Sequence, residues 1–170
     1  MKLNLKLIKS KNLSKKLLHM IVKLKKQSWN YSINSQIRWF LNYTKTNDKN
    51  YLFFYNSKLA GYTLITKRLL ISRNVKSYYY LLDTIIVDKK HRMRGFGNYI
   101  LSLLLKNYSR LKYPLLIITE KKNYLFYKKS NLIKLSKKKI IFNDYNTKDK
   151  IILTNKPCNF IKRCNVHIYR

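Results

Sequence analysis

The sequence predicts an α/β fold in which about seven strands and about four helices form one domain. Short runs of aromatic and branched residues have the composition of strands, and longer segments carry apolar residues at helical spacing. One strand-like run leads through a basic, glycine-containing loop directly into a helical segment, which indicates a strand–loop–helix unit. At 170 residues the chain is long enough for one domain with a single sizeable core.

The first half of the chain is predicted to begin with a strand and two helices. Leu3 to Lys9 alternates apolar and basic residues, which predicts a first strand. The first helix is expected to have its N-cap at Ser10 or Asn12. Its apolar stripe consists of Leu13, Leu17, Met20, Ile21 and Leu24. A second, shorter helix over 33–41 and strands near 51–56, 60–68 and 77–88 follow.

The second half is predicted to contain two further helices and three strands. In order, these are a helix at 96–110, a strand at 114–119, a helix at 122–129 and strands near 131–142 and 150–155. Asn143 to Thr147 has the composition of a turn between the last two strands. The segment 156–170, which begins with Lys-Pro, is expected to be a loosely attached tail, so that the domain spans 1–155.

The segment from Val87 to Gly97 reads Val-Asp-Lys-Lys-His-Arg-Met-Arg-Gly-Phe-Gly and contains two of the chain's three glycines. Because it precedes a helix, its N–H groups and the positive end of the helix dipole can bind a phosphate. A P-loop is excluded, since Gly-x-x-x-x-Gly-Lys-Ser/Thr does not occur. A dinucleotide fingerprint fits poorly because bulky Ile100 stands where its third small residue belongs.

The remaining pattern, Val-x-x-x-x-Arg-x-Arg-Gly-x-Gly, resembles the acetyl-CoA-binding motif of the GCN5-related N-acetyltransferases. Asn56 to Gly61 resembles the hairpin between the second and third strands of this family, with Gly61 near the turn. Asn123 to Leu132 is similar to the family's Asn…Phe-Tyr-x-Lys-x-Gly-Phe segment. The resemblance covers roughly residues 3–155. It implies a GNAT-like fold with a central, mostly antiparallel mixed sheet, and an acetyl-CoA-dependent N-acetyltransferase.

The resemblance also implies how acetyl-CoA would be held. Main-chain groups at the end of the fourth strand would contact the pantetheine and the thioester, and main-chain N–H groups of the loop would hold the pyrophosphate. The two arginines of the loop would add charge, with simple solvation as the alternative. The expected CoA-binding residues are Ile85, Ile86, Val87, Arg92, Met93, Arg94, Gly95, Phe96, Gly97, Asn98 and Asn123.

Acyl transfer to an amine needs a neutral amine and a proton for the leaving thiolate. By resemblance, Tyr127 is the candidate general acid, although ordinary packing is the alternative in a chain with 15 tyrosines. Asp83 and Glu120 are the candidate bases, and a structural salt bridge with one of the many lysines is the alternative for both. Asn131 stands where the family often has Gly, and Asn tolerates the positive φ that such a turn can demand.

The acceptor is expected to contact the segment between the first two helices and the second helix, which commonly line the acceptor pocket in this fold. The residues concerned are Trp29, Tyr31, Gln36 and Trp39, with core packing as the alternative for the tryptophans. The expected acceptor is a primary amine, either in a small molecule such as an amino sugar or in a protein.

The formal net charge of +32, from 38 Lys and Arg against 6 Asp and Glu, raises an alternative function. A basic nucleic-acid-binding module on a degenerate GNAT-like fold would carry such a charge. However, the lysines are spread over nearly every segment and form no separate basic block. We therefore expect no specific nucleic-acid partner, and expect the charge to favour anionic ligands such as CoA.

Other features predict a reduced, cytoplasmic enzyme without a metal. No apolar run approaches the roughly 20 residues that span a bilayer, and the N-terminus lacks the apolar segment of a secretory signal. Cys158 and Cys164 do not match a metal-ligand spacing, and the histidines at 19, 91 and 167 suggest no triad. Since neither cysteine lies near the predicted site, we expect direct transfer in a ternary complex. The sequence does not indicate the oligomeric state.

Overall fold

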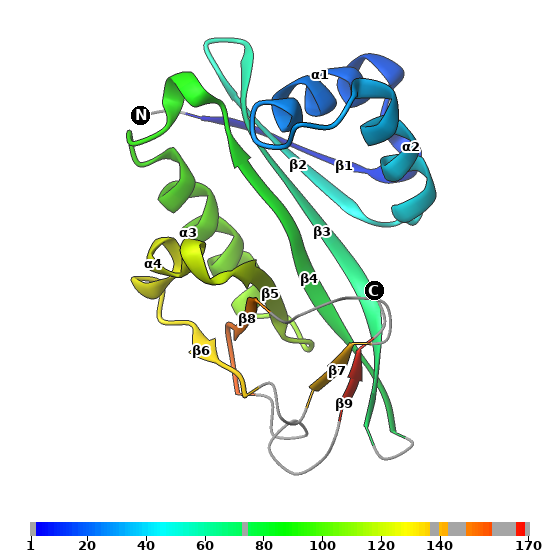
Figure 1. The fold of residues 1–170 in the computed structure, drawn as a ribbon, viewed down its shortest axis with the longest axis vertical. Helices are drawn as coiled ribbons and strands as arrows, with labels where there is room; N and C mark the ends of the chain where they lie inside the picture. The colour runs from blue at the N-terminus through cyan, green and yellow to red at the C-terminus, as the bar shows by residue number, and fades with distance from the viewer. Residues whose placement is uncertain (1–2, 73–74, 137–139, 143–148, 158–165, 169–170) are drawn as a thin grey trace. The chain divides into compact units, whose positions relative to one another are not determined.

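The computed structural model describes residues 3–72, 75–136, 140–142, 149–157 and 166–168. These residues form nine strands, four α-helices and three short 3-10 helices (Figure 1). The strands are β1 (Asn4–Lys9), β2 (Lys49–Tyr55), β3 (Lys58–Ser72), β4 (Val75–Val87), β5 (Leu115–Glu120), β6 (Ile133–Lys134), β7 (Ile140–Phe142), β8 (Lys150–Thr154) and β9 (Val166–Ile168). The helices are η1 (Ser10–Asn12), α1 (Lys15–Lys26), α2 (Ile33–Tyr43), η2 (Lys89–His91), α3 (Phe96–Ser109), η3 (Lys121–Asn123) and α4 (Tyr124–Lys128).

The strands pair in the order β1-β2-β3-β4-β5-β8-β6, and β9 pairs with both β3 and β7. β4 and β5 are parallel, with the crossover helix α3 between them in the chain. The pairs β1–β2, β2–β3, β5–β8 and β6–β8 are antiparallel. This mixed, mostly antiparallel sheet with four α-helices in the described residues confirms the predicted fold class.

The chain divides into two compact units. The first consists of Met1–Thr66 and Asp83–Ile100, and the second of Lys67–Leu82 and Leu101–Arg170. The long strands β3 and β4 and the helix α3 therefore contribute residues to both units.

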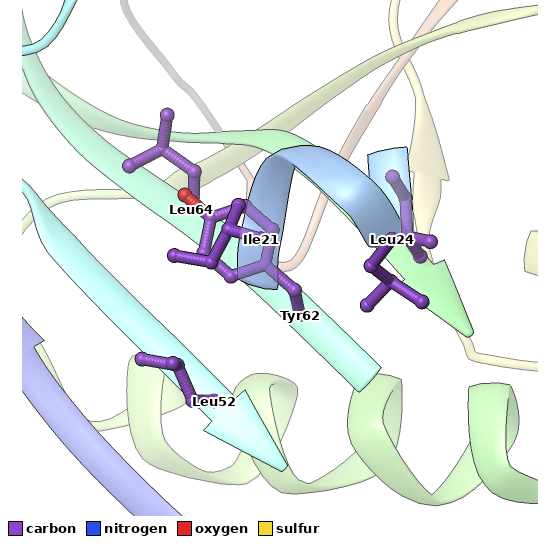
Figure 2. Close-up of a cluster of buried hydrophobic side chains, with 6 residues drawn as sticks. Ile21, Leu24, Leu52, Tyr62 and Leu64 are labelled. Atoms are coloured by element: carbon purple, nitrogen blue, oxygen red, sulfur yellow. The ribbon is translucent and has the colours of Figure 1, made fainter. Parts of the chain in front are cut away.

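The core of the first unit lies between α1 and the strands β2 and β3. Ile21 and Leu24 of α1 form a buried cluster with Leu52, Tyr62 and Leu64 of the strands (Figure 2), and all five are at most 3% exposed. The spacing of three along the helix and of two along β3 places each pair on one face. Full burial of such a side chain contributes about 1.5–3 kcal/mol, so this cluster fixes α1 on the strands.

The first α-helix begins later than predicted. Its N-cap is Ser14, whose side chain accepts a main-chain N–H of the first turn at 3.3 Å. The predicted caps, Ser10 and Asn12, lie in η1. Ser10 instead donates its N–H to the carbonyl of Asp48 at 2.9 Å. The cap prediction was wrong because this contact, which joins residues distant in sequence, places a separate 3-10 turn before the helix.

β2 and β3 form the predicted hairpin, and Gly61, expected near its turn, lies inside β3. The turn consists of Asn56 and Ser57, with φ of 47° and 61°, the left-handed conformation of a tight hairpin turn. Gly61 pairs with Phe53 inside the strands. A Cβ built on Gly61 would lie 2.7 Å from Cδ1 of Ile100 in α3. The absence of a side chain at this position thus allows the helix to approach the strand closely.

The core of the second unit surrounds β5. The buried cluster contains Leu70, Tyr79, Leu81, Leu116 and Ile152, all at most 2% exposed. β5 pairs with β4 on one side and with β8 on the other. A strand covered on both faces needs apolar residues at successive positions, which explains why the sequence of β5 begins Leu-Leu-Ile-Ile without alternation.

The remaining predicted elements are present with shifted ends. β3 and β4 are longer than predicted, the predicted helix at 122–129 is divided into η3 and α4, and the described part of 131–142 contains the short strands β6 and β7. Asn131 has φ of 51°, which confirms the expected positive φ. β9 lies within the segment predicted to be a tail. The turn at 143–147 and both cysteines lie outside the described residues.

Candidate active site

The loop that follows β4 in the first unit starts at Asp88. Its N–H donates to the carbonyl of Ala60 at 2.8 Å, and its carboxylate accepts the N–H of Lys90 at 2.8 Å. Burial by itself would raise the pKa of Asp88. The hydrogen bonds from Gln27 and Lys90, with the charges of His91 and Lys90, outweigh burial and hold this pKa below its ordinary value. Asp88 therefore stays ionised and anchors the start of the loop.

The end of the loop is exposed and contains two residues in the left-handed conformation. Met93 has φ of 59° and Gly95 has φ of 78°. A Cβ built on Gly95 would meet no heavy atom of the described residues within 4 Å, so the space beside its main chain is open. The N–H of Tyr99 donates to the carbonyl of Gly95 at 3.0 Å. Residues 96–98 come before Tyr99 in the first turn of α3. An anion can bind to their N–H groups.

The side chain of Arg92 is directed to the protein. Its Nε donates to the carbonyl of Val87 at 3.0 Å, and its Nη2 donates to the hydroxyl of Ser28 at 2.8 Å. Arg92 thus joins the end of β4 to the residue that follows the C-cap of α1. These contacts favour a positioning role for Arg92, whereas Arg94 is exposed beside Gly95 and is the better candidate for adding charge toward a phosphate.

Gln27, the C-cap of α1, contacts the same loop with both ends of its side chain. Its Nε2 donates to Oδ2 of Asp88 at 3.0 Å, and its Oε1 accepts the N–H of Lys89 at 2.9 Å. A carboxamide is suited to this position because it can donate to a carboxylate and accept an N–H at the same time. Sequence analysis missed Gln27, since no local pattern relates it to a loop 61 residues away.

Three aromatic rings at the loop pack against one another. The ring of His91 stacks on Phe96 with centroids 5.0 Å apart, and Tyr55 meets the rings of His91 and Phe96 edge-on at 5.3 and 5.5 Å. Because the side chain of Phe96 is only 4% exposed, its predicted contribution to CoA binding is limited to the main chain. His91, for which the sequence suggested no catalytic role, supports the loop by packing.

The other predicted donor-site residues of this unit lie at the end of β4 and the start of α3. Ile86 is buried in the core, and Ile85 and Val87 are half-buried. The carbonyl of Val87, one of the main-chain groups predicted to contact the donor, accepts Arg92. Gly97 is half-buried and Asn98 is exposed, both in the first turn of α3.

The two tryptophans predicted to line the acceptor pocket lie around Lys25. Its ammonium group is 4.0 Å from the ring centroid of Trp39 and 5.7 Å from that of Trp29. Trp39 also stacks on Tyr43 and packs against the core of the first unit. Trp39 is therefore mainly a packing residue, whereas Trp29 is 39% exposed and can contact a ligand.

The other two predicted acceptor residues are joined by one hydrogen bond. Gln36 is only 5% exposed and donates its Nε2 to the carbonyl of Tyr31 at 3.3 Å. The side chain of Tyr31 is 63% exposed. Gln36 thus holds the segment before α2 in place, and Tyr31 presents its ring to solvent.

Asp83 lies half-buried in the part of β4 that belongs to the first unit. It accepts the hydroxyl of Thr84 at 3.2 Å. Burial, and then the charges of Asp83 and Asp48, raise the pKa of Tyr62 well above its ordinary value. Tyr62 is therefore neutral, and it donates its hydroxyl to Asn50 at 2.8 Å.

Tyr127 and Asn123 belong to the second unit, at α4. Burial raises the pKa of Tyr127 to about 12, and a hydrogen bond with Thr119 opposes this shift. Tyr127 is 5% exposed. The side chain of Asn123 donates to the hydroxyl of Thr119 at 3.4 Å. The structure therefore brings these two predicted residues together through Thr119, and Tyr127 keeps its proton at neutral pH.

Glu120, at the end of β5, forms ion pairs with two lysines. Its carboxylate lies 2.6 Å from Nζ of Lys122 and 3.5 Å from Nζ of Lys150. The hydrogen bond with Lys122, with the charges of both lysines, lowers the pKa of Glu120 despite some burial. A carboxylate with a lowered pKa is a weaker base, so these contacts favour a structural role.

A metal site and a membrane-spanning helix are both absent from the described part of the chain. No group of three or more His, Cys, Asp or Glu side chains there could hold a metal ion. No helix among these residues is long and apolar enough to cross a membrane.

Comparison with solved structures identifies the fold. YhbS from Escherichia coli, a GNAT family N-acetyltransferase solved in complex with CoA, superposes with a TM-score of 0.70 at 9% identity over 99% of this chain and 89% of its own. Escherichia coli ElaA gives 0.65 at 14% identity, over 91% and 100% of the two chains. The ribosomal-protein-S18-alanine N-acetyltransferase from Escherichia coli gives 0.58 at 18% identity, over 89% and 92%. No protein-family model and no curated protein matches the sequence. By its structure, the chain has the fold of the GCN5-related N-acetyltransferases.

Proposed function

We propose that this protein is an N-acetyltransferase that transfers an acetyl group from acetyl-CoA to a primary amine by direct transfer in a ternary complex. The observation that carries the proposal is the turn at Gly95. It combines a left-handed glycine, open space beside its main chain, and the start of a 14-residue helix. Such a turn fits a pyrophosphate, and it occurs on a fold whose solved examples include an N-acetyltransferase in complex with CoA.

The proposed roles of the donor-site residues follow from these positions. The N–H groups of residues 95–98 bind the pyrophosphate, and Arg94 adds positive charge. Main-chain groups of Met93 and of residues 85–87 complete the donor site of the first unit. Asn123 of the second unit is a separate candidate for contact with acetyl-CoA. The net charge of +32 assists by attracting an anionic donor over long range.

Acetyl-CoA supplies an acetyl group activated as a thioester. Tyr127 holds the proton that the departing thiolate requires, and its pKa of about 12 keeps the phenol protonated at neutral pH. Asp83 is the proposed base that accepts a proton from the acceptor amine, because Glu120 is weakened as a base by its two lysines. Trp29 and Tyr31 contact the acceptor, which is an amine of a small molecule such as an amino sugar or of a protein.

Calorimetry with acetyl-CoA tests the proposal. The protein should bind it saturably, and Gly95→Ala should weaken binding at least tenfold, because a methyl group enters the open space and the left-handed backbone becomes strained. Gly95→Asn separates these causes, since Asn tolerates the backbone conformation but fills the same space. Equal affinity in all three proteins would contradict the phosphate-binding assignment.

A second candidate function is nucleic-acid binding on a catalytically degenerate GNAT-like fold. Only the net charge of +32 favours it. Titration with RNA and DNA at several salt concentrations separates the two functions. Tight binding with a preference among sequences, together with no binding of acetyl-CoA, would favour the second function; weak binding without preference is what the charge alone produces.

A further inference from the structure

The loop that is proposed to bind the pyrophosphate is joined to the end of α1 by four side chains. They are Gln27 and Ser28 on one side and Asp88 and Arg92 on the other. Gln27 bonds the carboxylate of Asp88, and Arg92 bonds the hydroxyl of Ser28, at 3.0 and 2.8 Å. We call these four residues the α1–loop latch.

We propose that the α1–loop latch is a positioning device for catalysis: it holds the donor loop in its binding conformation and fixes it to the first residue of the acceptor segment. This inference rests on the proposed function and adds residues to it. Neither Gln27 nor Ser28 is expected to touch CoA. Both act through the loop.

The geometry distinguishes the latch from ordinary surface contacts. The two ends of Gln27 are both used, one by the carboxylate of Asp88 and the other by the N–H of Lys89 at 2.9 Å. Arg92 likewise uses two donors, toward Ser28 and toward the carbonyl of Val87. Paired contacts of this kind fix orientation as well as distance. The start of the loop is therefore held at two points, only a few residues before Gly95.

The latch also relates the two proposed binding regions of the first unit. Ser28 begins the segment that continues through Trp29 to Tyr31, where the acceptor is expected. Arg92 belongs to the loop where the donor is expected. A change that breaks the bond between Arg92 and Ser28 should therefore alter both the dissociation constant for acetyl-CoA and the KM for the acceptor.

Gln27→Glu provides a sharp test, because it places a second carboxylate next to Asp88. At pH 8 both groups are ionised and repel each other, so acetyl-CoA should bind about tenfold more weakly than to the parent protein. At lower pH the pair takes up a shared proton, since like charges raise the pKa of one member. The hydrogen bond then forms again and the affinity should recover. Gln27→Leu should bind weakly at every pH.

The controls isolate this effect. Lys90 and His91 also act on Asp88, and in Gln27→Glu they attract the added carboxylate as well. Gln27→Leu adds no charge, so its affinity relative to the parent at the same pH reports the loss of the latch without this attraction. Asn34→Asp adds the same charge at an exposed position of α2 and should follow the parent. Hydrogen exchange of the amides at 88–95 in the free proteins should be faster in Gln27→Leu, independently of acetyl-CoA.

Arg92 is tested through its partner. Ser28→Ala removes the hydroxyl that Arg92 binds without changing any charge. If the latch positions the loop, Ser28→Ala should weaken acetyl-CoA binding several-fold. Adding Arg92→Lys to Ser28→Ala should not restore the affinity. If Arg92 instead binds the phosphates, Ser28→Ala should have no effect, which would overturn this part of the latch.

The outcomes separate the latch from the proposed function. A parent protein that does not bind acetyl-CoA would overturn the proposed function and the latch's role in binding. A parent protein that binds acetyl-CoA, with Gln27→Leu and Gln27→Glu each binding it as tightly as the parent at pH 8, would overturn the latch alone.

Discussion

Gly61 of β3 and Ile100 of α3 approach each other closely in the first unit: a Cβ on Gly61 would lie 2.7 Å from Cδ1 of Ile100 and 3.3 Å from the carbonyl oxygen of Ile86. Ile100 is fully buried, so its side chain has little room to move aside. The contact brings the helix that begins at the proposed phosphate-binding turn close to the strands. It also explains why Gly61, the one glycine outside the loop, lies inside a strand.

Gly61→Ala should therefore destabilise the protein by about 1–3 kcal/mol, the usual cost of overpacking. Ile100→Val removes the clashing Cδ1 and by itself should cost about 0.5–1.5 kcal/mol. The double variant should be more stable than the sum of the two effects predicts. Urea denaturation of the four proteins measures this, and strictly additive effects would contradict the close approach.

The stability of the protein should decrease at alkaline pH through its buried tyrosines. The pKa of Tyr127 is raised to about 12, and that of Tyr62 is raised well above the ordinary value of 10. From pH 10 upward the unfolded chain ionises these groups while the folded protein does not, so unfolding is favoured. Each tyrosine should lower the free energy of unfolding by about 1.4 kcal/mol per pH unit between its two pKa values. Below pH 10 this effect is absent.

Denaturation curves at pH 9, 10 and 11 provide the measurement. Tyr127→Phe should reduce the alkaline slope, because Phe cannot ionise in either state. Tyr31→Phe, which removes a hydroxyl from a side chain that is 63% exposed, is the matched control and should retain the parent's slope. The same slope in Tyr127→Phe and in the parent would contradict the raised pKa.

Tyr127→Phe should lower kcat by about 10²-fold. General acids contribute about 10²- to 10⁴-fold, and we expect the lower end, since a phenol with a pKa of about 12 is a weaker acid than a thiol. The affinity for acetyl-CoA should change little. Steady-state kinetics combined with calorimetry checks both; unchanged turnover across the pH range would remove Tyr127 as the acid and leave it a packing residue.

Replacing Asp83 and Glu120 by their amides should affect kcat differently. Asp83→Asn should lower kcat by at least 10²-fold, as expected for loss of a general base. Glu120→Gln should leave kcat nearly unchanged and alter stability by less than about 1 kcal/mol, because Glu120 is 43% exposed and exposed ion pairs contribute little. Initial rates at saturating acetyl-CoA distinguish the two variants. A larger loss in Glu120→Gln would reverse the assignment of the base.

Most of the fold could be predicted from local patterns. The alternation of Leu3 to Lys9 predicted β1, and the helical spacing after Gly97 predicted α3. Where the prediction differed, a contact between residues distant in the chain was responsible. Ser10 is not a cap because it bonds to Asp48. Gly61, expected near the hairpin turn, lies inside β3, where the lack of a side chain leaves room for Ile100.

The site could be predicted only in part. The glycine pair identified the loop, but its two glycines differ: Gly95 has the left-handed conformation, whereas Gly97 lies in the first turn of α3. Arg92 was expected to face a phosphate, yet its side chain is held by Val87 and Ser28. The direction of a side chain depends on the partners that folding brings near it, and sequence spacing does not report them.

The sequence by itself determined the order of the main strands and helices, the place of the proposed phosphate-binding turn and its resemblance to an acyltransferase motif, because periodicity, glycine and turn residues act locally. Only the tertiary structure decided that Gln27 and Asp88, 61 residues apart, are hydrogen-bonded, that Glu120 forms ion pairs with two lysines and that Tyr127 is buried. Hydrogen bonds, ion pairs and burial depend on which distant segments pack together, and that arrangement exists only in the folded chain.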